Sequence, residues 1–146
     1  MLEIRKIEPE LTYSIRHTVL RPNQTLEDSM YETDHDDYAF HVGAFFQGML
    51  VSVASFIVDR NPDFPIDKQY RLRQMATLGD YRNIGAGRAV VNYGENLIKD
   101  EGFYFLWCKG RTNVQEYYSR LGFHAHGEVF DYPPIGPHIL MYKELK

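Results

Sequence analysis

Short apolar runs alternate with amphipathic stretches along most of this chain, a pattern typical of a domain that mixes strands with helices. Runs rich in β-branched and aromatic residues predict strands at residues 2–7, 38–46, 49–59, 70–78, 103–108, 123–130 and 138–142. Apolar residues at helical spacing predict helices at residues 9–20, 88–100 and 113–121, with a short helix inside the polar stretch 21–37. The order β-α-α-β-β-β-α-β-α-β-β predicts a single α/β domain over residues 1–146 with a mixed sheet.

Local features sharpen this prediction. Gln47 and Gly48 join two strand-like runs and predict a hairpin. Gly94 lies on the apolar face of the helix at 88–100, where it permits close packing on the sheet at a cost of about 1 kcal/mol in helix propensity. Residues 103–108 are nearly all apolar and predict a buried central strand. The one cysteine, Cys108, lies in that strand and is predicted to be a core residue rather than a nucleophile.

Composition excludes several classes of protein. Hydrophobic residues make up 44% of the chain, which argues against disorder. No apolar run is long enough to span a membrane, the N-terminus has no signal-peptide core, and a single cysteine fits a reducing compartment, so we expect a cytoplasmic protein without a membrane partner. The net charge of −4 provides no broad basic surface for nucleic acid. The many aromatic residues leave room for a homodimer.

The charge is distributed unevenly. Residues 1–70 carry 12 acidic and 6 basic side chains, whereas residues 71–146 carry 8 and 10. Around one glycine-containing segment the charge balance is locally basic, because residues 71–88 contain one acidic residue, Asp80, and four arginines: Arg71, Arg73, Arg82 and Arg88. Such a cluster suits a compact polyphosphate better than an extended duplex. Arginines scattered over a solvated face are the alternative.

The segment from Arg82 to Arg88 lies between a predicted strand and a predicted helix and contains Gly85 and Gly87. Glycines let the backbone approach an anion, and N–H groups at a helix start attract negative charge. We therefore predict a pyrophosphate site here, with a plain tight turn as the alternative. A Walker loop is excluded because Gly87 precedes Arg88 instead of lysine, and the dinucleotide fingerprint is excluded because Val90 replaces its third glycine.

Two motifs and the order of elements resemble the GCN5-related N-acetyltransferase (GNAT) superfamily over nearly the whole chain. The family's loop Arg/Gln-x-x-Gly-x-Gly/Ala is matched at Arg82, Gly85 and Gly87, and its aromatic-Tyr-x-x-x-Gly-Phe junction at Tyr117, Tyr118, Gly122 and Phe123. The resemblance implies a mixed, mainly antiparallel sheet of six to seven strands with about four helices on its two faces. Residues 136–143 are similar to a bacterial subgroup whose last strand opens with Pro-His and ends with Met-x-Lys.

The resemblance further implies transfer of an acetyl group from acetyl-CoA to a primary amine of a small molecule. It places pantetheine along Met75, Ala76 and Thr77, and the pyrophosphate on Arg82, Asn83, Ile84, Gly85, Ala86, Gly87 and Arg88. Tyr118 matches the tyrosine that in many members donates a proton to the departing CoA thiolate, a role that suits a phenol. The family often has Asn where Arg111 stands and Ala where Val114 stands, so Asn113 is carried over only as a neighbouring CoA contact.

The general base does not follow from the motifs. Many family members carry a carboxylate base on the strand before the loop, and residues 70–77 contain none. The base then lies elsewhere, is a water chain, or is missing. Among His138, Glu128, Asp131 and His41 we favour His138, because it opens the last strand and imidazole titrates near neutral pH. A structural histidine is the alternative.

The strand before the loop also carries candidate acceptor contacts. By the two-residue period, Arg71 and Arg73 share a face with Met75 and Thr77. If that face lines the acceptor cleft, the acceptor carries a carboxylate or a phosphate beside its amine. Pairing of the two arginines with the acidic first half of the chain is an equal alternative.

The remaining polar clusters give weaker signals. His124 and His126, with His138, resemble a metal set but lack a cysteine or carboxylate at suitable spacing, so no metal is predicted. Residues 34–37 lack the glycine and final glutamate of a calcium loop and predict a solvated loop on the acceptor side. Because no strand carboxylate is present, a non-catalytic acyl-CoA sensor or interaction module of the same fold is the alternative function. A protein lysine is a further candidate acceptor.

Overall fold

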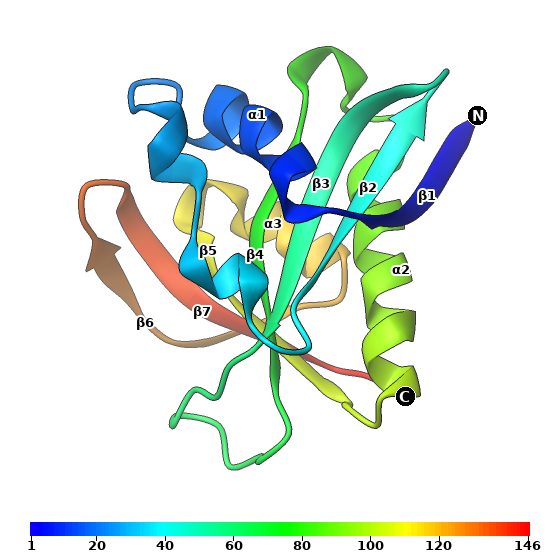
Figure 1. The fold of residues 1–146 in the computed structure, drawn as a ribbon. Helices are drawn as coiled ribbons and strands as arrows, with labels where there is room; N and C mark the ends of the chain where they lie inside the picture. The colour runs from blue at the N-terminus through cyan, green and yellow to red at the C-terminus, as the bar shows by residue number, and fades with distance from the viewer.

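A computed structural model describes all 146 residues. Seven strands form one sheet in the order β1-β2-β3-β4-β5-β7-β6 (Figure 1). Their bounds are β1 Leu2–Ile7, β2 Phe40–Phe46, β3 Met49–Val58, β4 Tyr70–Thr77, β5 Phe105–Arg111, β6 His124–Tyr132 and β7 Gly136–Glu144. All neighbouring strands are antiparallel except β4 and β5, which are parallel. The predicted mixed, mainly antiparallel sheet is therefore confirmed.

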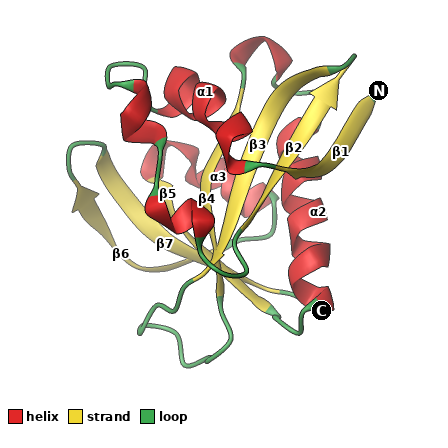
Figure 2. Ribbon diagram, viewed as in Figure 1, coloured by secondary structure: helices red, strands yellow, loops and turns green.

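Helices cover both faces of this sheet (Figure 2). One face carries a continuous but irregular helical segment: a 3₁₀ turn η1 (Pro9–Thr12), α1 (Tyr13–Ile15) and a π turn η2 (Arg16–Leu20). The other face carries α2 (Ala86–Asp100) and α3 (Gln115–Arg120). Further 3₁₀ turns are η3 (Leu26–Ser29), η4 (Glu32–His35), η5 (Gly79–Tyr81) and η6 (Thr112–Val114). The three α-helices are one fewer than expected, and none is long and apolar enough to cross a membrane.

The main core lies between α2 and the sheet. A cluster of 18 buried side chains includes Val90, Val91 and Ile98 from one stripe of α2. Gly94 faces the ring of the fully buried Phe56 so closely that a β-carbon there would overlap it, which confirms the predicted close packing. The helix ends where Gly102, at φ 83°, donates its N–H to a backbone carbonyl of the last turn.

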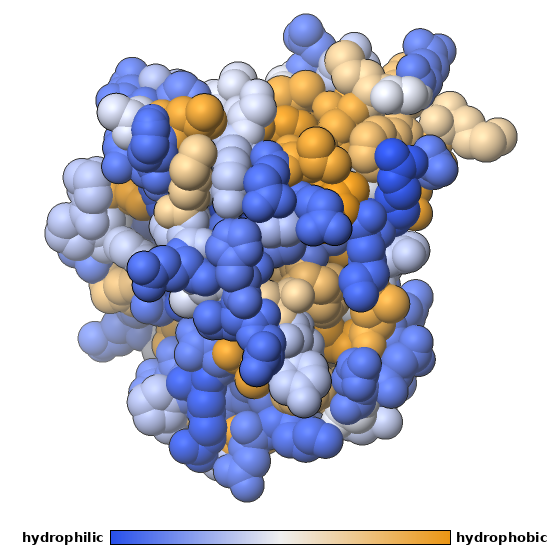
Figure 3. Space-filling model, viewed as in Figure 1, coloured by the Kyte–Doolittle hydropathy of each residue, from blue (hydrophilic) through white to orange (hydrophobic).

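The face under α1 has a smaller apolar core and a more polar cover. Only Ile15, Val53 and Ala76 form its buried apolar cluster. The segment between α1 and β2 crosses this face, and Figure 3 shows that its surface is mostly hydrophilic, with apolar atoms gathering towards the tip of β2 and β3. This side of the sheet is therefore held by polar contacts as well as by apolar packing.

The sheet opens between β4 and β5. These strands pair only at Tyr70 with Leu106 and at Arg71 with Trp107, and they separate beyond that point. Opposite β3, β4 carries one extra residue, Gln74, at φ 52°, so the register shifts. This bulge turns Met75 to the α2 face, where it packs on the main core, and the prediction that Met75 shares a face with Arg71 and Arg73 is wrong.

Candidate functional site

A cleft of about 700 Å³ lies where β4 and β5 separate. Its walls come from β4, β5, the start of α2, η6 and α3, and the ends of η2 and β7. Every residue that the sequence assigns to the site lines this cleft except Ile84, which is 41% exposed on the surface. The predicted site residues come from β4, α2, η6, α3, β7 and the loop before α2, and the fold brings them together in one place.

The glycine segment forms a cradle of free backbone donors. Asn83 and Gly85 adopt left-handed backbone angles, with φ 69° and 85°, and Gly85 caps the start of α2. None of the N–H groups from Asn83 to Arg88 donates a hydrogen bond within the protein; the first such bond is donated by the N–H of Ala89 to the carbonyl of Gly85, at 3.0 Å. A row of free N–H groups at the positive end of a helix of this length fits a pyrophosphate.

Gly87 allows the cradle to approach the neighbouring helix. A β-carbon at this position would overlap the hydroxyl of Tyr117 and lie 3.1 Å from the terminal methyl of Met75. Gly87 therefore leaves room for the ends of the Tyr117 and Met75 side chains, which would have to shift around a β-carbon. Gly85 has open space around it, and its left-handed backbone angle is what favours glycine.

Tyr118 stands at the opening between β4 and β5. Its ring lies edge-on to Phe123, with centroids 5.7 Å apart, and within 3.3 Å of the place where a β-carbon of Gly110 would be. Burial, followed by the neighbouring Cys108 and Tyr117, raises the pKa of the Tyr118 phenol. The group therefore keeps its proton at neutral pH and is available as a hydrogen-bond donor.

His138 is the one candidate base that lies in the cleft. It is buried, and its Nδ1 lies 2.8 Å from the carbonyl oxygen of Gly136. Because a carbonyl can only accept, Nδ1 donates this hydrogen bond, which leaves Nε2 as the ring nitrogen that can accept a proton. Glu128 and Asp131 are exposed and do not line the cleft. His41 also lies outside the cleft, where it contacts Ser55 and the backbone of Asp34.

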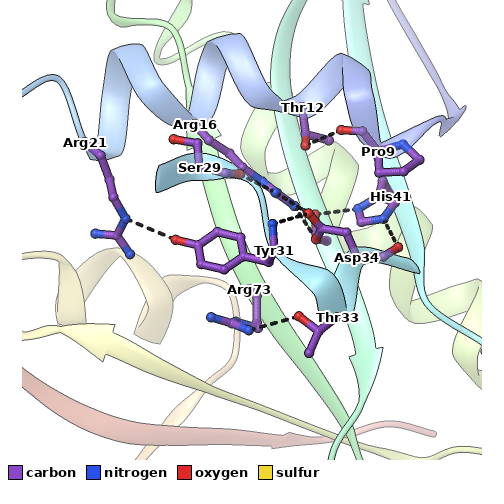
Figure 4. Close-up of polar contacts among 11 residues, drawn as sticks. Pro9, Thr12, Arg16, Arg21, Ser29, Tyr31, Thr33, Asp34, His41 and Arg73 are labelled. Carbon is purple, nitrogen blue, oxygen red and sulfur yellow. Dashed lines mark hydrogen bonds and ion pairs between the residues drawn. The ribbon is translucent and has the colours of Figure 1, made fainter. Parts of the chain in front are cut away.

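Arg71 and Arg73 project to the face of the sheet opposite α2. Arg71 pairs with Asp59 at 3.2 Å, so the predicted pairing with the acidic half of the chain holds for this residue. Arg73 has no carboxylate partner: its Nη1 donates to the Thr33 hydroxyl at 3.3 Å and its guanidinium lies 4.9 Å from the Tyr31 ring centroid (Figure 4).

Sequence reasoning missed other basic residues in the cleft. Arg21, Lys109, Arg111 and Arg120 all line it. Lys109 and Arg111 were missed because the predicted strand ended at residue 108, whereas β5 continues to Arg111. Lys109 and Arg111 alternate with the small residues Cys108 and Gly110, which is the two-residue period of a strand. This alternation was the sequence signal that the strand continues to residue 111.

A buried polar network joins the segment 21–37 to the sheet (Figure 4). Arg16 is completely buried and makes two hydrogen bonds to the carboxylate of Asp34, at 2.7 and 2.8 Å. It also donates to the Ser29 carbonyl at 2.9 Å and to the Ser55 hydroxyl at 2.7 Å. The prediction that residues 34–37 form a solvated loop is therefore wrong for Asp34, because its carboxylate is the buried partner of an arginine.

His41 completes this network as a neutral ring. Its Nε2 donates to the backbone carbonyl of Asp34 at 3.0 Å, and its Nδ1 lies 2.7 Å from the Ser55 hydroxyl, which can donate to it. Burial is the largest cause that lowers the pKa of His41; the Asp34 contacts oppose it, and Arg16 and His35 add to it.

We expect this histidine to make the protein less stable in mild acid. Below its ordinary pKa of about 6.5 the unfolded chain binds a proton that folded His41 does not, so the free energy of unfolding falls as pH decreases through that value towards the lower folded pKa. His41→Gln should show a shallower fall over this range in denaturant titrations. The exposed His124→Gln, on β6, is the control, and an unchanged slope in His41→Gln would contradict the assignment.

The other clusters form no second site. No three His, Cys, Asp or Glu side chains converge as metal ligands, and His126 instead lies 3.9 Å from the carboxylate of Asp63. Cys108 is buried, and burial raises the pKa of its thiol to about 12, so it is a protonated core residue.

Known proteins are similar to this chain in sequence and in fold. The chain matches the Acetyltransferase (GNAT) family over residues 3–123. It is 44% identical over 146 residues to the uncharacterized N-acetyltransferase YitI of Bacillus subtilis (strain 168), covering 100% of this chain and 98% of YitI. Its fold is similar to FeeM, an N-acyl amino acid synthase from uncultured soil microbes (TM-score 0.80, 15% identity, 99% and 91% of the two chains), and to an aminoglycoside 6′-N-acetyltransferase complexed with coenzyme A (TM-score 0.75, 16% identity, 97% and 96%).

Proposed function

Because the chain belongs to the GNAT acetyltransferase family, we propose that residues 1–146 act as one domain that transfers an acetyl group from acetyl-CoA to a primary amine of a small molecule. The observation that carries this proposal is the row of free N–H donors from Asn83 to Arg88, which shares one cleft with Tyr118 and His138. A phosphate cradle, a phenol donor and an imidazole acceptor are the groups that such a transfer needs.

Acetyl-CoA would bind along two adjoining surfaces. The pyrophosphate would accept hydrogen bonds from the N–H groups of 83–88, with Arg82 and Arg88 adding full positive charges. The pantetheine arm would follow the edge of β4 at residues 75–77, where β5 no longer pairs with that strand. An edge that is free of its neighbour leaves backbone groups for the amides of the arm. The CoA complex of the aminoglycoside enzyme, which has the same fold, supports this choice of ligand.

The transfer itself would occur at the opening between the strands. The neutral amine attacks the thioester carbonyl, a C–N bond forms and the C–S bond breaks. His138 Nε2 would take the proton that the amine loses. The Tyr118 hydroxyl would donate a hydrogen bond to the departing sulfur and so stabilise the thiolate. Because the pKa of this phenol is raised, the proton stays on the phenol oxygen. CoA leaves as the thiol once a proton from solvent has been delivered.

Calorimetric titration with acetyl-CoA tests the cradle. Gly85→Val places a β-branched residue at φ 85°, so the loop must change its angle and redirect its N–H groups; we expect at least about tenfold weaker binding with the fold intact. Gly127→Val is the matched control, because Gly127 has φ 76°, also has nothing near its β-carbon and lies outside the cleft. Equal affinity in both variants would remove the cradle from the proposal.

A further inference from the structure

The cleft has a charge opposite to that of the protein. The chain has a net charge of −4, yet seven arginines and one lysine line the cleft and no aspartate or glutamate does. Arg82 and Arg88 lie at the glycine cradle, where phosphate charge accounts for them. Of the other basic side chains, Arg71 and Arg120 pair with Asp59 and Glu116. No carboxylate lies within 4.0 Å of Arg21, Arg73, Lys109 or Arg111, so their charges need another explanation.

Four of these basic side chains, from β4 and β5, lie on one face of the sheet: Arg71, Arg73, Lys109 and Arg111. The guanidinium of Arg71 lies 4.8 Å from the centroid of the Trp107 ring, so both project to the same side. Lys109 and Arg111 follow Trp107 at two-residue steps along β5 and share that side. His138 lies directly opposite Arg111 in the β5–β7 pairing, which puts the candidate base on the same face.

Tyr118 approaches from the opposite side. Cys108 and Gly110, which alternate with these basic residues, face the α2 side, where Cys108 joins the main core and Gly110 meets the Tyr118 ring. The gap between β4 and β5 therefore connects a CoA side with a basic side. Arg73 and Arg111 line the cleft on the basic side.

The charges of Arg73 and Arg111 are held in place but not neutralised. Arg73 contacts only the Thr33 hydroxyl and the Tyr31 ring, and Arg111 donates to the Leu20 carbonyl at 3.1 Å. No carboxylate lies within 4.0 Å of either guanidinium. Burial, followed by repulsion from Arg71, lowers the pKa of Arg73, and burial, followed by repulsion from Arg21, lowers the pKa of Arg111.

We propose that the acceptor is a small amine that carries a carboxylate, as an amino acid does, and that Arg73 and Arg111 bind this carboxylate on the face opposite Tyr118. The inference rests on the proposed acetyl transfer and names the class of its acceptor. Guanidinium groups match planar carboxylates and gain most where their charge is otherwise unpaired. Polycationic amines and lysine-rich tails are disfavoured, because the basic face repels them.

The same face also favours the reactive form of the acceptor. A cluster of positive charges lowers the pKa of a nearby ammonium group, so a bound amine loses its proton more readily than it does in water. This removes part of the need for a strong base and fits a cleft that has one imidazole and no carboxylate. The carboxylate supplies the affinity that the ammonium group would lose.

The test compares amino acids with their primary amides, which keep the side chain and the amine but have a neutral amide in place of the negatively charged carboxylate. Thiol release would be measured with acetyl-CoA at a pH above the pKa of both amines. We expect the acids to have a kcat/KM about tenfold to hundredfold higher than their amides. In Arg73→Gln and Arg111→Gln this preference should shrink towards one, because kcat/KM falls more for the acids than for the amides. Arg60→Gln, an exposed arginine outside the cleft, is the control and should keep the preference.

Binding separates the two proposals. N-acetyl amino acids and their amides would be titrated into the protein saturated with CoA. Preferential binding of the acids without turnover of any amine would overturn the acetyl transfer and support the carboxylate site. Turnover that is equal for acids and amides, or highest for polyamines or a lysine peptide, would support the transfer and overturn the inference. Equal or absent binding of the two product series would also overturn it.

Discussion

Arg16→Met is expected to destabilise the folded protein by about 3–5 kcal/mol, because it leaves the carboxylate of Asp34 buried without its partner. The side chains of Arg16 and Asp34 are 0% and 4% exposed, so water cannot replace the lost contacts. Asp34 would keep only the backbone N–H of Tyr31, at 3.3 Å. Chemical denaturation at neutral pH measures the loss, and the melting temperature should fall by on the order of 10 °C.

A double variant distinguishes the lost charge pair from general disruption. Arg16→Met with Asp34→Leu removes both charges, so it should lose much less stability than the sum of the single variants. Arg60→Met is the surface control: Arg60 and Asp67 are 3.6 Å apart and largely exposed, and we expect a change below about 1 kcal/mol. A loss this small in Arg16→Met would mean that the buried pair does not hold the segment 21–37.

The ion pair also matters for the site. The residues that contact Arg73, Tyr31 and Thr33, belong to the segment that Asp34 anchors, and the Tyr31 hydroxyl accepts a hydrogen bond from Arg21 at 3.1 Å (Figure 4). Variants that weaken the anchor should therefore weaken acceptor binding before they weaken CoA binding. None of the hydrogen bonds of this network involves the glycine cradle at the start of α2.

Local sequence patterns predicted most of the fold, because most of its elements are determined by residues that are close together in the sequence. The apolar stripe of α2, its cap at Gly102 and the paired runs of β2 and β3 are set within one element or one hairpin. The glycine motif located the cradle for the same reason. The family resemblance then supplied the number of strands and the mainly antiparallel character of the sheet, which short-range patterns do not encode.

The features that sequence reasoning missed depend on contacts between distant residues. Arg16 follows Ile15 in an amphipathic pattern and gives no local sign that it is fully buried; its partner Asp34 is 18 residues away. The bulge at Gln74 interrupts the two-residue alternation of β4. A prediction that assumes unbroken alternation therefore puts Met75 on the wrong face of the sheet. The unpaired charge of Arg73 becomes visible only when its whole surroundings are assembled.

Tyr118→Phe is expected to lower turnover by about a hundredfold or more while leaving CoA affinity nearly unchanged. The variant removes one hydroxyl and keeps the ring that packs on Phe123 and against Gly110, so the fold should be unaffected. Single-turnover thiol release and calorimetric titration with CoA measure the two quantities separately. Tyr104→Phe, a 56% exposed tyrosine outside the cleft, is the matched control and should have wild-type turnover.

This variant also decides between an enzyme and a non-catalytic acyl-CoA sensor. The cleft contains no carboxylate base, which favours a sensor, but it holds a phenol with a raised pKa and an imidazole with a free Nε2, which a sensor does not need. In an enzyme the Tyr118 hydroxyl stabilises the thiolate only as the C–S bond breaks, so its loss affects turnover and not binding. If Tyr118→Phe weakens CoA binding and turnover to the same extent, the hydroxyl is a binding contact, and the group that stabilises the thiolate has to be sought elsewhere in the cleft.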